Sequence, residues 1–330
     1  MTLKPLFVSL FILPLFTMTA CAKEPSVDSD GIPKTRSNLT ADEQKQLDDF
    51  LVQQKINMRF IEGGSYEMGD FGSKVTINDG GPIRSESDNK PLHKVTLDSF
   101  SMNAYKATYS DFDVYSMVTG QDKFGTEIYM EAIRKPNAAA GINWQTAQHY
   151  CQWLGQQLDV PMNLPTEAQW EYAARNRGKY VLFPTDNGHI NGGHNIATFD
   201  EMQKLSRKYR TSLAIPTVGL YPPNPLGLYD MTNQNNEWMT DWYSEDYYAN
   251  SPEHNPQGPK TGTEKVVRSV NADWGDAQNV LANGSITLMR IKRLPTAPVD
   301  EFEKKEHEGK TNYDYSTSAR CVANSTQEIN

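Results

Sequence analysis

The chain has 330 residues, of which 38% are hydrophobic and 10% are aromatic, and its formal net charge at pH 7 is −9. This apolar content is sufficient for a folded core. The acidic balance argues against a nucleic-acid-binding protein, because the basic footprint of that class is missing, and it identifies no other partner.

The N-terminus has the pattern of a secretory signal. Lys4 supplies a positive charge ahead of an apolar run over residues 6–16. That run is too short to span a bilayer, which needs about 20 residues. Residues 18–21 (MTAC) then resemble a lipoprotein cleavage box. We predict a signal peptide over residues 1–20 and a lipid on Cys21; the alternative is ordinary cleavage beside this cysteine, which would leave a plain thiol.

The residues after the lipid site predict an anchor and a spacer. Ala22 differs from the aspartate that usually retains lipoproteins at the inner membrane, so the anchor is expected in the outer membrane of a Gram-negative cell, with the domain facing the periplasm. Residues 21–39 contain no aromatic side chain and predict a flexible tether. A Thr-x-x-Glu capping box opens a leading helix over residues 40–57. The main domain is predicted over residues 58–324.

Local signals predict short elements within the domain. Helices are expected to begin after three residues that can cap them: Thr108, Asn143 and Thr166. Strands are expected over residues 58–68, where two glycines break the pattern, around Val95 and Leu97, and over residues 265–267. Residues 180–224 show little periodicity and predict a long irregular loop, of the kind that often serves function or binds ions.

Two cysteines remain besides the predicted lipid site. Cys151 falls on the apolar face of the helix after Asn143, where a buried, unreactive side chain is expected. Cys321 lies near the C-terminus. In an oxidising compartment a disulfide between them is compatible with the sequence, which does not decide the question.

Residues 227–243 (GLYDMTNQNNEWMTDWY) combine an Asn-rich turn with four aromatic residues. Asn and Asp favour turns because their side chains bond to nearby backbone. Asp230 and Glu237 offer hard oxygen ligands of the kind that calcium takes. Trp238 and Trp242 would share a buried face on a short helix. On composition alone, the preferred interpretation is an Asn-rich turn that leads into an aromatic core element.

This stretch resembles the GLYDM-x-GN-x-WEW-x-x-DW signature of the formylglycine-generating enzyme family, also called the sulfatase-modifying-factor domain. Five other stretches resemble the family in the same order: residues 60–69 (FIEGGSYEMG), 93–100 (HKVTLDSF), 142–144 (INW), 164–175 (LPTEAQWEYAAR) and 218–224 (VGLYPPN). The resemblance covers roughly residues 58–323. It implies a compact α+β fold related to C-type lectins, with short helices and strands and much irregular loop.

The resemblance also implies a calcium site in the Asn-rich stretch. By position, its ligands would be the side chains of Asp230 and Glu237 and the backbone carbonyls of Asn233 and Asn235. Asn233 replaces a glycine, which is tolerable because asparagine adopts left-handed backbone angles more readily than most residues.

A second calcium site of the family begins with an Asn–Ile pair, which Asn195 and Ile196 match. Its later aspartate ligand has no clear counterpart in this chain. Asp200 is the fallback.

Known members of the family oxidise a sulfatase cysteine with copper(I) held by two thiolates, a metal that soft sulfur ligands select. Cys321, in residues 318–321 (SARC), matches one of these cysteines, and the position of the other falls on Arg290. Residues 268–274 (RSVNADW) lack the family's glycines, and the link over residues 298–320 is longer and charged. Copper is therefore not expected. Cys321 would be catalytic only if oxidase chemistry persists, and otherwise it would be a buried structural thiol.

The sequence thus predicts a membrane-tethered periplasmic lipoprotein whose domain is a pseudoenzyme, without copper oxidase chemistry. It would act as a binding or accessory module for a periplasmic or envelope protein. By analogy, some family members are encoded in type VI secretion gene clusters, where they act as accessory or immunity proteins. A lipoprotein fits such a role. One alternative is a divergent active oxidase that acts on a periplasmic protein or a siderophore. The other is a purely structural cell-envelope protein.

Overall fold

A computed structural model of the chain describes residues 25–126, 134–210, 216–232, 235–269, 286–296 and 316–329. The predicted signal peptide, Cys21, Asn233 and the charged residues 298–310 lie outside these ranges. Statements below about the structure concern the described residues.

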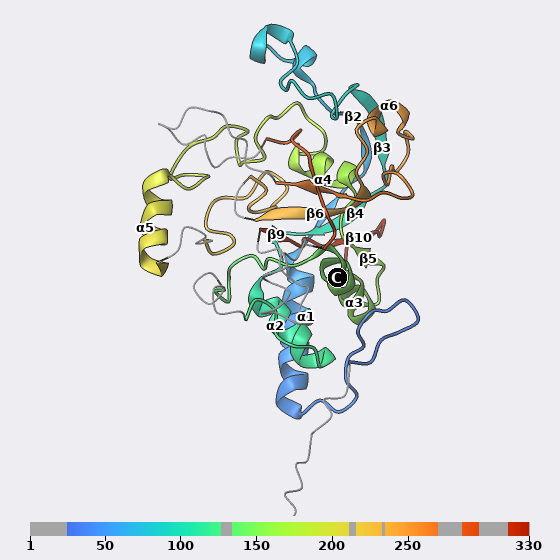
Figure 1. Cartoon of the computed structure of the whole chain (residues 1–330), viewed down its shortest axis with the longest axis vertical. Helices are drawn as coiled ribbons and strands as arrows, with labels where there is room; N and C mark the ends of the chain where they lie inside the picture. The colour runs from blue at the N-terminus through green and yellow to red at the C-terminus, as the bar shows by residue number, and fades with distance from the viewer. Residues whose placement is uncertain are drawn as a thin grey trace, which may run out of the picture.

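Short strands form three small sheets around the centre of the molecule (Figure 1). The first has the order β1-β4-β10-β5 and is antiparallel, the second pairs β2 with β3, and the third has the order β8-β7-β6-β9. The strands are β1 Met58–Ile61, β2 Gly64–Met68, β3 His93–Leu97, β4 Phe100–Asn103, β5 Met162–Asn163, β6 Asn236–Trp242, β7 Lys265–Arg268, β8 Ile291–Arg293, β9 Thr317–Ser318 and β10 Val322–Ala323.

The C-terminal segment joins two of these sheets. Strand β9 runs parallel to β6, and β10, which follows after three residues, lies between β4 and β5. Arg320 and Cys321 therefore sit at the junction of the two sheets, where both side chains are buried. Through these pairings the C-terminal strands β9 and β10 lie against β4, β5 and β6, which come from earlier parts of the chain.

The helices begin where the capping signals predict. Thr40, Thr108 and Thr166 each form a capping box at the start of a helix. Asn143 caps the helix that follows it by accepting a hydrogen bond from the N–H of Thr146. The helices are α1 Ala41–Asn57, α2 Tyr109–Thr119, α3 Trp144–Leu158, α4 Glu167–Ala174, α5 Phe199–Tyr209 and α6 Tyr247–Asn250, with 3-10 turns η1 Gly72–Lys74 and η2 Ile77–Gly80. Short helices and short strands together confirm the α+β class.

The larger apolar cluster lies among α1, α2 and α3, and α1 and α2 run side by side in the lower half of Figure 1. Its aromatic rings are in mutual contact: the ring centre of Trp153 lies 6.0 Å from that of Phe50 and 5.0 Å from that of Tyr115. The leading helix is thus part of the domain core.

The segment before α1 differs from the predicted free tether. Ile32 is only 5% exposed and belongs to the apolar cluster. Trp153 Nε1 donates to Thr35 Oγ1 at 3.0 Å, and Arg36 Nη2 donates to the carbonyl of Met117 at 2.8 Å. Residues 25–39 therefore pack along the domain, because their few apolar and hydrogen-bonding groups find partners on α2 and α3.

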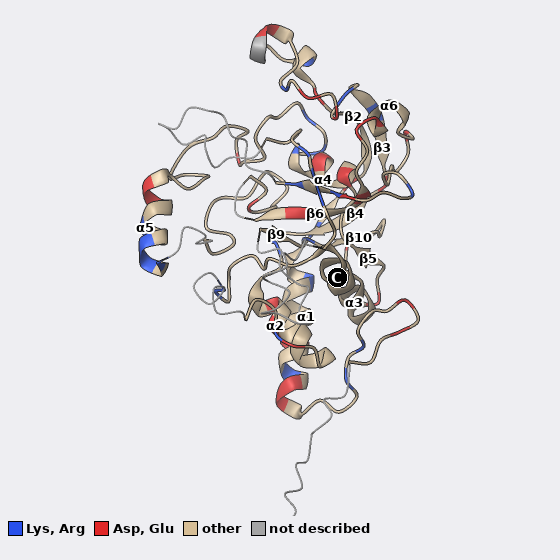
Figure 2. Ribbon diagram, viewed as in Figure 1, with Lys and Arg blue, Asp and Glu red and all other residues tan. Residues whose placement is uncertain are grey.

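Two further elements differ from the predictions. Trp238 and Trp242 lie on strand β6 and not on a helix, because pairing with β7 and β9 satisfies this backbone. Helix α5 occupies part of the predicted irregular loop, and Thr198 forms a capping box with Glu201 at its start. None of the residues of α5 is buried, and it projects from one side of the molecule with acidic residues at its start and basic residues at its end (Figure 2).

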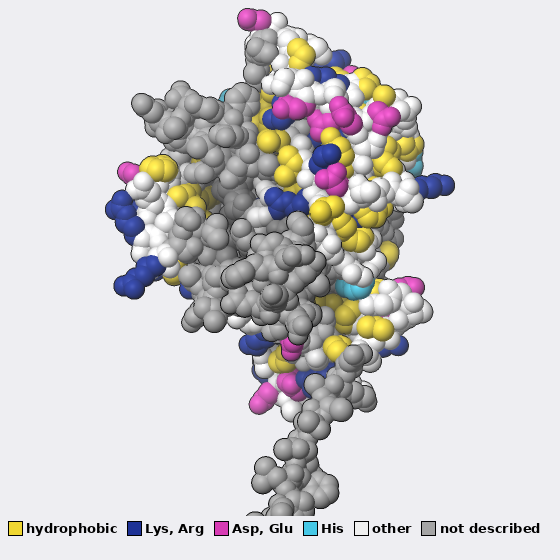
Figure 3. All heavy atoms as spheres, in the orientation of Figure 1, with side chains coloured by type: hydrophobic (Ala, Val, Ile, Leu, Met, Phe, Trp, Pro, Cys, Tyr) yellow, Lys and Arg dark blue, Asp and Glu magenta, His cyan; other side chains and the backbone are white. Residues whose placement is uncertain are grey.

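No helix in the described parts of the chain is long and apolar enough to cross a membrane. On the face drawn in Figure 3, acidic and basic side chains are interspersed over the described surface.

Candidate functional site

The two cysteines of the domain form a disulfide. Cys151 on α3 and Cys321 before β10 are joined by an Sγ–Sγ bond of 2.02 Å, with their Cα atoms 5.3 Å apart. Both residues are at most 1% exposed and lie in the larger apolar cluster. The buried position of Cys151 is as predicted. The match of Cys321 to a catalytic thiol is corrected, because a sulfur in a disulfide is neither a nucleophile nor a copper ligand.

The Asn-rich stretch places a buried carboxylate against two cations. Glu237 is fully buried, and Arg320 holds it with two hydrogen bonds, from Nε to Oε2 at 2.9 Å and from Nη2 to Oε1 at 3.0 Å. Trp170 Nε1 donates to the same Oε2 at 3.0 Å. On the other side, Lys106 Nζ lies 3.7 Å from Oε1. Both carboxylate oxygens therefore already have cationic or N–H partners from the protein.

Lys106 reaches this cluster from the link between β4 and α2. Its side chain is fully buried, and Nζ donates to the backbone carbonyl of Asn235 and, at 3.2 Å, to Ser269 Oγ. The sequence analysis assigned this residue no role. A lysine within the otherwise uncharged residues 99–110 is the signal that was available, because a lone charge between two buried elements needs a partner.

The charged residues of this cluster shift one another's pKa values. Burial alone would raise the pKa of Glu237, but Arg320 and then Lys106 lower it overall. Burial raises the pKa of Asp230, against the opposing effects of the Gly219 N–H and of Lys106. Burial also lowers the pKa of Lys106 to about 8, partly offset by Glu237. At neutral pH the cluster thus contains an ionised Glu237 facing an ammonium and a guanidinium.

The second predicted calcium position forms a closed hydrogen-bonded turn. Asn195 Oδ1 accepts from the N–H of Asn191 at 2.8 Å, and its Nδ2 donates to Asp186 Oδ1 at 2.8 Å. The carbonyl of Ile196 accepts from the N–H of Gly193 at 2.8 Å. The oxygen atoms proposed as ligands are thus used within the turn. The fallback, Asp200, lies exposed in the first turn of α5.

The acidic side chains of α4 hold buried arginines in a chain of ion pairs. Glu167 accepts from Arg290 Nε at 2.7 Å and Nη2 at 2.9 Å, and from Arg268 Nη1 at 3.2 Å. Glu171, one turn later, accepts from Arg268 Nη2 at 2.6 Å and Arg175 Nη1 at 2.8 Å. The two glutamates share one face of α4 because they are four residues apart. The LPTEAQWEYAAR block contained both residues, but the sequence analysis gave them no role.

The contacts of Arg290 are therefore those of a residue that holds the fold together. Its guanidinium also donates to the carbonyl of Asp88 at 2.6 Å and lies 4.7 Å from the ring centre of Tyr248. Its charge is neutralised by Glu167 on α4, whereas Cys321 is bonded to Cys151 on α3. The position predicted for a second copper thiolate is thus part of the α4 ion-pair chain.

Comparison with known proteins identifies the family. A profile of the sulfatase-modifying factor enzyme 1-like domain matches residues 43–285, well over half of the chain. The chain belongs to this family. It is 28% identical over 284 residues to the serine/threonine-protein kinase pkn1 of Chlamydia pneumoniae, an alignment that covers 78% of this chain and 42% of that protein.

Two other relatives support the same fold. The formylglycine-generating enzyme of Streptomyces coelicolor is 26% identical over 255 residues, which cover 63% of this chain and 76% of the enzyme. The structure of PvdO from Pseudomonas aeruginosa aligns with a TM-score of 0.53 at 20% identity, covering 81% of this chain and 93% of PvdO. This chain spans less than half the length of the three Pkn1 proteins that it matches. The matches confirm the predicted family and fold.

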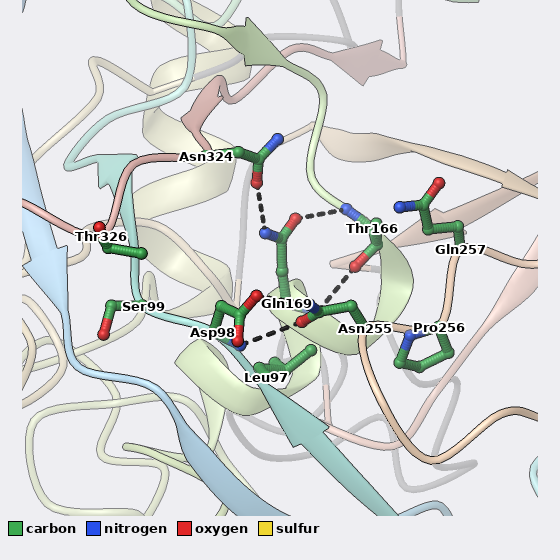
Figure 4. A pocket seen from close by; sticks show the side chains of 10 residues that line it. All are labelled: Leu97, Asp98, Ser99, Thr166, Gln169, Asn255, Pro256, Gln257, Asn324 and Thr326. Atoms are coloured by element: carbon green, nitrogen blue, oxygen red, sulfur yellow. Dashed lines mark hydrogen bonds between the residues drawn. The ribbon is translucent and has the colours of Figure 1, made fainter.

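This member of the family has a polar pocket of about 280 Å³ between the end of β3, the start of α4 and the C-terminal segment (Figure 4). Gln169 Nε2 donates to Asn324 Oδ1 at 2.8 Å, and Asn255 Nδ2 donates to Asp98 Oδ2 at 2.8 Å. The described residues that line it include no cysteine or histidine. The pocket can offer amides and hydroxyls to a polar ligand.

Asp241→Asn is expected to remove a pH-dependent loss of stability. Burial, and then the charge of Glu167, raise the pKa of Asp241 to about 7. The folded state therefore binds this proton more tightly than the unfolded chain, so the stabilisation is complete below about pH 4 and is lost as the pH rises through 7. Asparagine has no such proton, yet it keeps an oxygen for the Glu167 N–H, which Asp241 accepts at 2.9 Å.

The measurement is the free energy of unfolding in urea from pH 4 to pH 8. It should fall less in Asp241→Asn than in the wild type, by about 1 kcal/mol or more. The control is Asp49→Asn on the exposed face of α1, which should keep the wild-type profile. A wild-type pH profile in Asp241→Asn would contradict the raised pKa.

Proposed function

We propose that this protein is a lipid-anchored, periplasm-facing member of the sulfatase-modifying-factor family whose domain lacks copper oxidase chemistry. It serves as a binding or accessory module for a periplasmic or envelope protein, with a link to type VI secretion that includes an immunity role. The observation that carries the proposal is the Cys151–Cys321 disulfide.

The disulfide matters because the domain has no other cysteine. The chain contains three cysteines, and the third, Cys21, precedes the domain. Copper(I) chemistry by the two-thiolate route needs two free sulfurs that a substrate can approach. Here both sulfurs are bonded to each other, and their residues are at most 1% exposed. Reducing the bond would free two thiols without giving a substrate cysteine access to them.

The test is incubation of the purified, copper-loaded protein in air with a Cys-x-Pro-x-Arg peptide, followed by mass spectrometry. The expected result is no aldehyde product, with or without a thiol reductant. The formylglycine-generating enzyme of Streptomyces coelicolor serves as the positive control in the same assay. Aldehyde that forms with the wild type and disappears in Cys321→Ala would restore the divergent oxidase.

The anchor is tested separately. Cys21→Ser should abolish lipid attachment and move the protein from the outer-membrane fraction to the soluble periplasmic fraction. Ser26→Ala, which lies just beyond the lipid site, should leave fractionation unchanged. Unaltered processing of Cys21→Ser would show that the protein is not a lipoprotein, and it would leave the proposal about the domain unaffected.

A further inference from the structure

We infer that the ammonium group of Lys106 is an internal cation that takes the place of calcium in the loop between Asp230 and Glu237. The loop would then be held by a covalently attached charge and not by an ion from the medium. This inference concerns how the domain is stabilised and does not depend on the proposed function.

The position of the ammonium carries the inference. Two of the atoms assigned to a calcium ion by resemblance are the carbonyl of Asn235 and the carboxylate of Glu237. Lys106 Nζ donates to that carbonyl and lies 3.7 Å from Glu237 Oε1. A third assigned ligand, Asp230, is also buried, at 7% exposure. Two of the oxygen-bearing groups assigned to calcium thus lie against the ammonium.

These residues do not fit a calcium ion as they are arranged. Calcium takes six to eight oxygen ligands at about 2.3–2.6 Å. An ion that close to the Asn235 carbonyl and to Glu237 would have to share their oxygens with Nζ of Lys106, and like charges in a buried site repel strongly. An ammonium needs fewer partners, since it has three donors. Asn235 and Ser269 already accept hydrogen bonds from it.

The charges of the cluster are also balanced without calcium. Glu237 and Asp230 supply two carboxylates, and Lys106 and Arg320 supply two cations, all in residues at most 7% exposed. A buried charge is tolerated when it is paired. Adding a divalent ion would leave excess positive charge inside the protein, whereas removing the lysine charge would leave excess negative charge and an empty volume beside three oxygen-bearing residues.

The first experiment uses the wild-type protein. Calcium titration by calorimetry should show no stoichiometric binding, elemental analysis should find no calcium, and the melting temperature should be the same in 1 mM calcium and in EGTA. Stoichiometric calcium, or a melting temperature that EGTA lowers, would overturn the inference, and this measurement does not depend on whether any variant folds.

The second experiment creates the calcium site. Lys106→Ala should melt at a lower temperature than the wild type in EGTA, and calcium should restore it by roughly 5 °C or more when present at 100 times its dissociation constant. Lys106→Met fills the space without a charge, so calcium should restore it less or not at all. Failure of calcium to bind or stabilise Lys106→Ala would contradict the inference, because the oxygens would then not form a cation site.

Lys265→Ala is the matched control for loss of a buried lysine. Lys265 Nζ lies 3.8 and 3.7 Å from the ring centres of Trp144 and Trp242, and it donates to the carbonyl of Thr240 at 2.8 Å. Its environment is mainly aromatic, so Lys265→Ala should lose stability that calcium does not restore. Equal recovery of both variants would show a non-specific effect of calcium and would also contradict the inference.

Discussion

The double variant Cys151→Ala/Cys321→Ala should be less stable than the wild type by about 3–5 kcal/mol in the free energy of unfolding. The disulfide joins residues 170 positions apart. Cross-links that close long loops restrict the unfolded chain most, and the loop-entropy relation gives roughly 5 kcal/mol for this separation, against typical measured values of about 2–4 kcal/mol. The bond also ties helix α3 to the segment between β9 and β10, so its loss should loosen the junction of two sheets.

Urea denaturation measures this effect, and a reductant supplies the matched control. Dithiothreitol should bring the wild type close to the double variant and should leave the double variant unchanged. Each single substitution should match the double variant within about 1 kcal/mol, since either one removes the same bond. Equal stability of the double variant and the oxidised wild type would show that the disulfide contributes nothing.

Glu167→Gln should destabilise the protein by about 3–5 kcal/mol, because it removes one partner from a buried ion-pair chain. Glutamine has nearly the volume of glutamate but cannot neutralise Arg290 and Arg268, which are at most 4% exposed. At about 2–4 °C per kcal/mol for a domain of this size, the melting temperature should fall by roughly 6–20 °C. Glu167→Gln should lower the stability of the folded protein and should leave its metal content unchanged.

Asp49→Asn provides the comparison on the surface. The Lys45–Asp49 pair is more than two-thirds exposed on each side, and such pairs contribute at most about 1 kcal/mol. A double-mutant cycle adds a second check: Arg290→Met should cost less in the Glu167→Gln background than in the wild type, because its partner is already gone. A loss below about 1 kcal/mol in Glu167→Gln, or strict additivity in the cycle, would contradict the role given to this network.

The buried ions and the disulfide occupy the positions where the resemblance would place metal chemistry. Cys321 forms a covalent link, Arg290 forms an ion pair with Glu167, and Glu237, which the resemblance assigned to calcium, contacts Arg320 and Lys106. Each of these contacts fastens one part of the chain to a distant part. The domain therefore retains the family's architecture, and these contacts help to hold that architecture together.

The sequence by itself determined the family, the α+β class and the starts of most helices. Caps such as Thr108, Asn143 and Thr166 bond to the backbone three residues away, so their signals are complete within a few positions of the chain. The helical spacing of the apolar residues also predicted the buried face of α3, including the buried position of Cys151. The ordered motif blocks supplied the rest, because they record a fold that periodicity alone would not reveal.

Only the tertiary structure decided how distant residues meet. Trp238 and Trp242 have a spacing that suits either a helix or a strand, and pairing with β7 made β6 a strand. Residues 25–39 have no apolar core of their own, and hydrogen bonds to residues of α2 and α3 hold them in place. The partner of Cys321 and the contact of Lys106 with Asn235 each link residues more than 100 positions apart. Such contacts depend on the packing of whole elements, and no local pattern in the sequence specifies them.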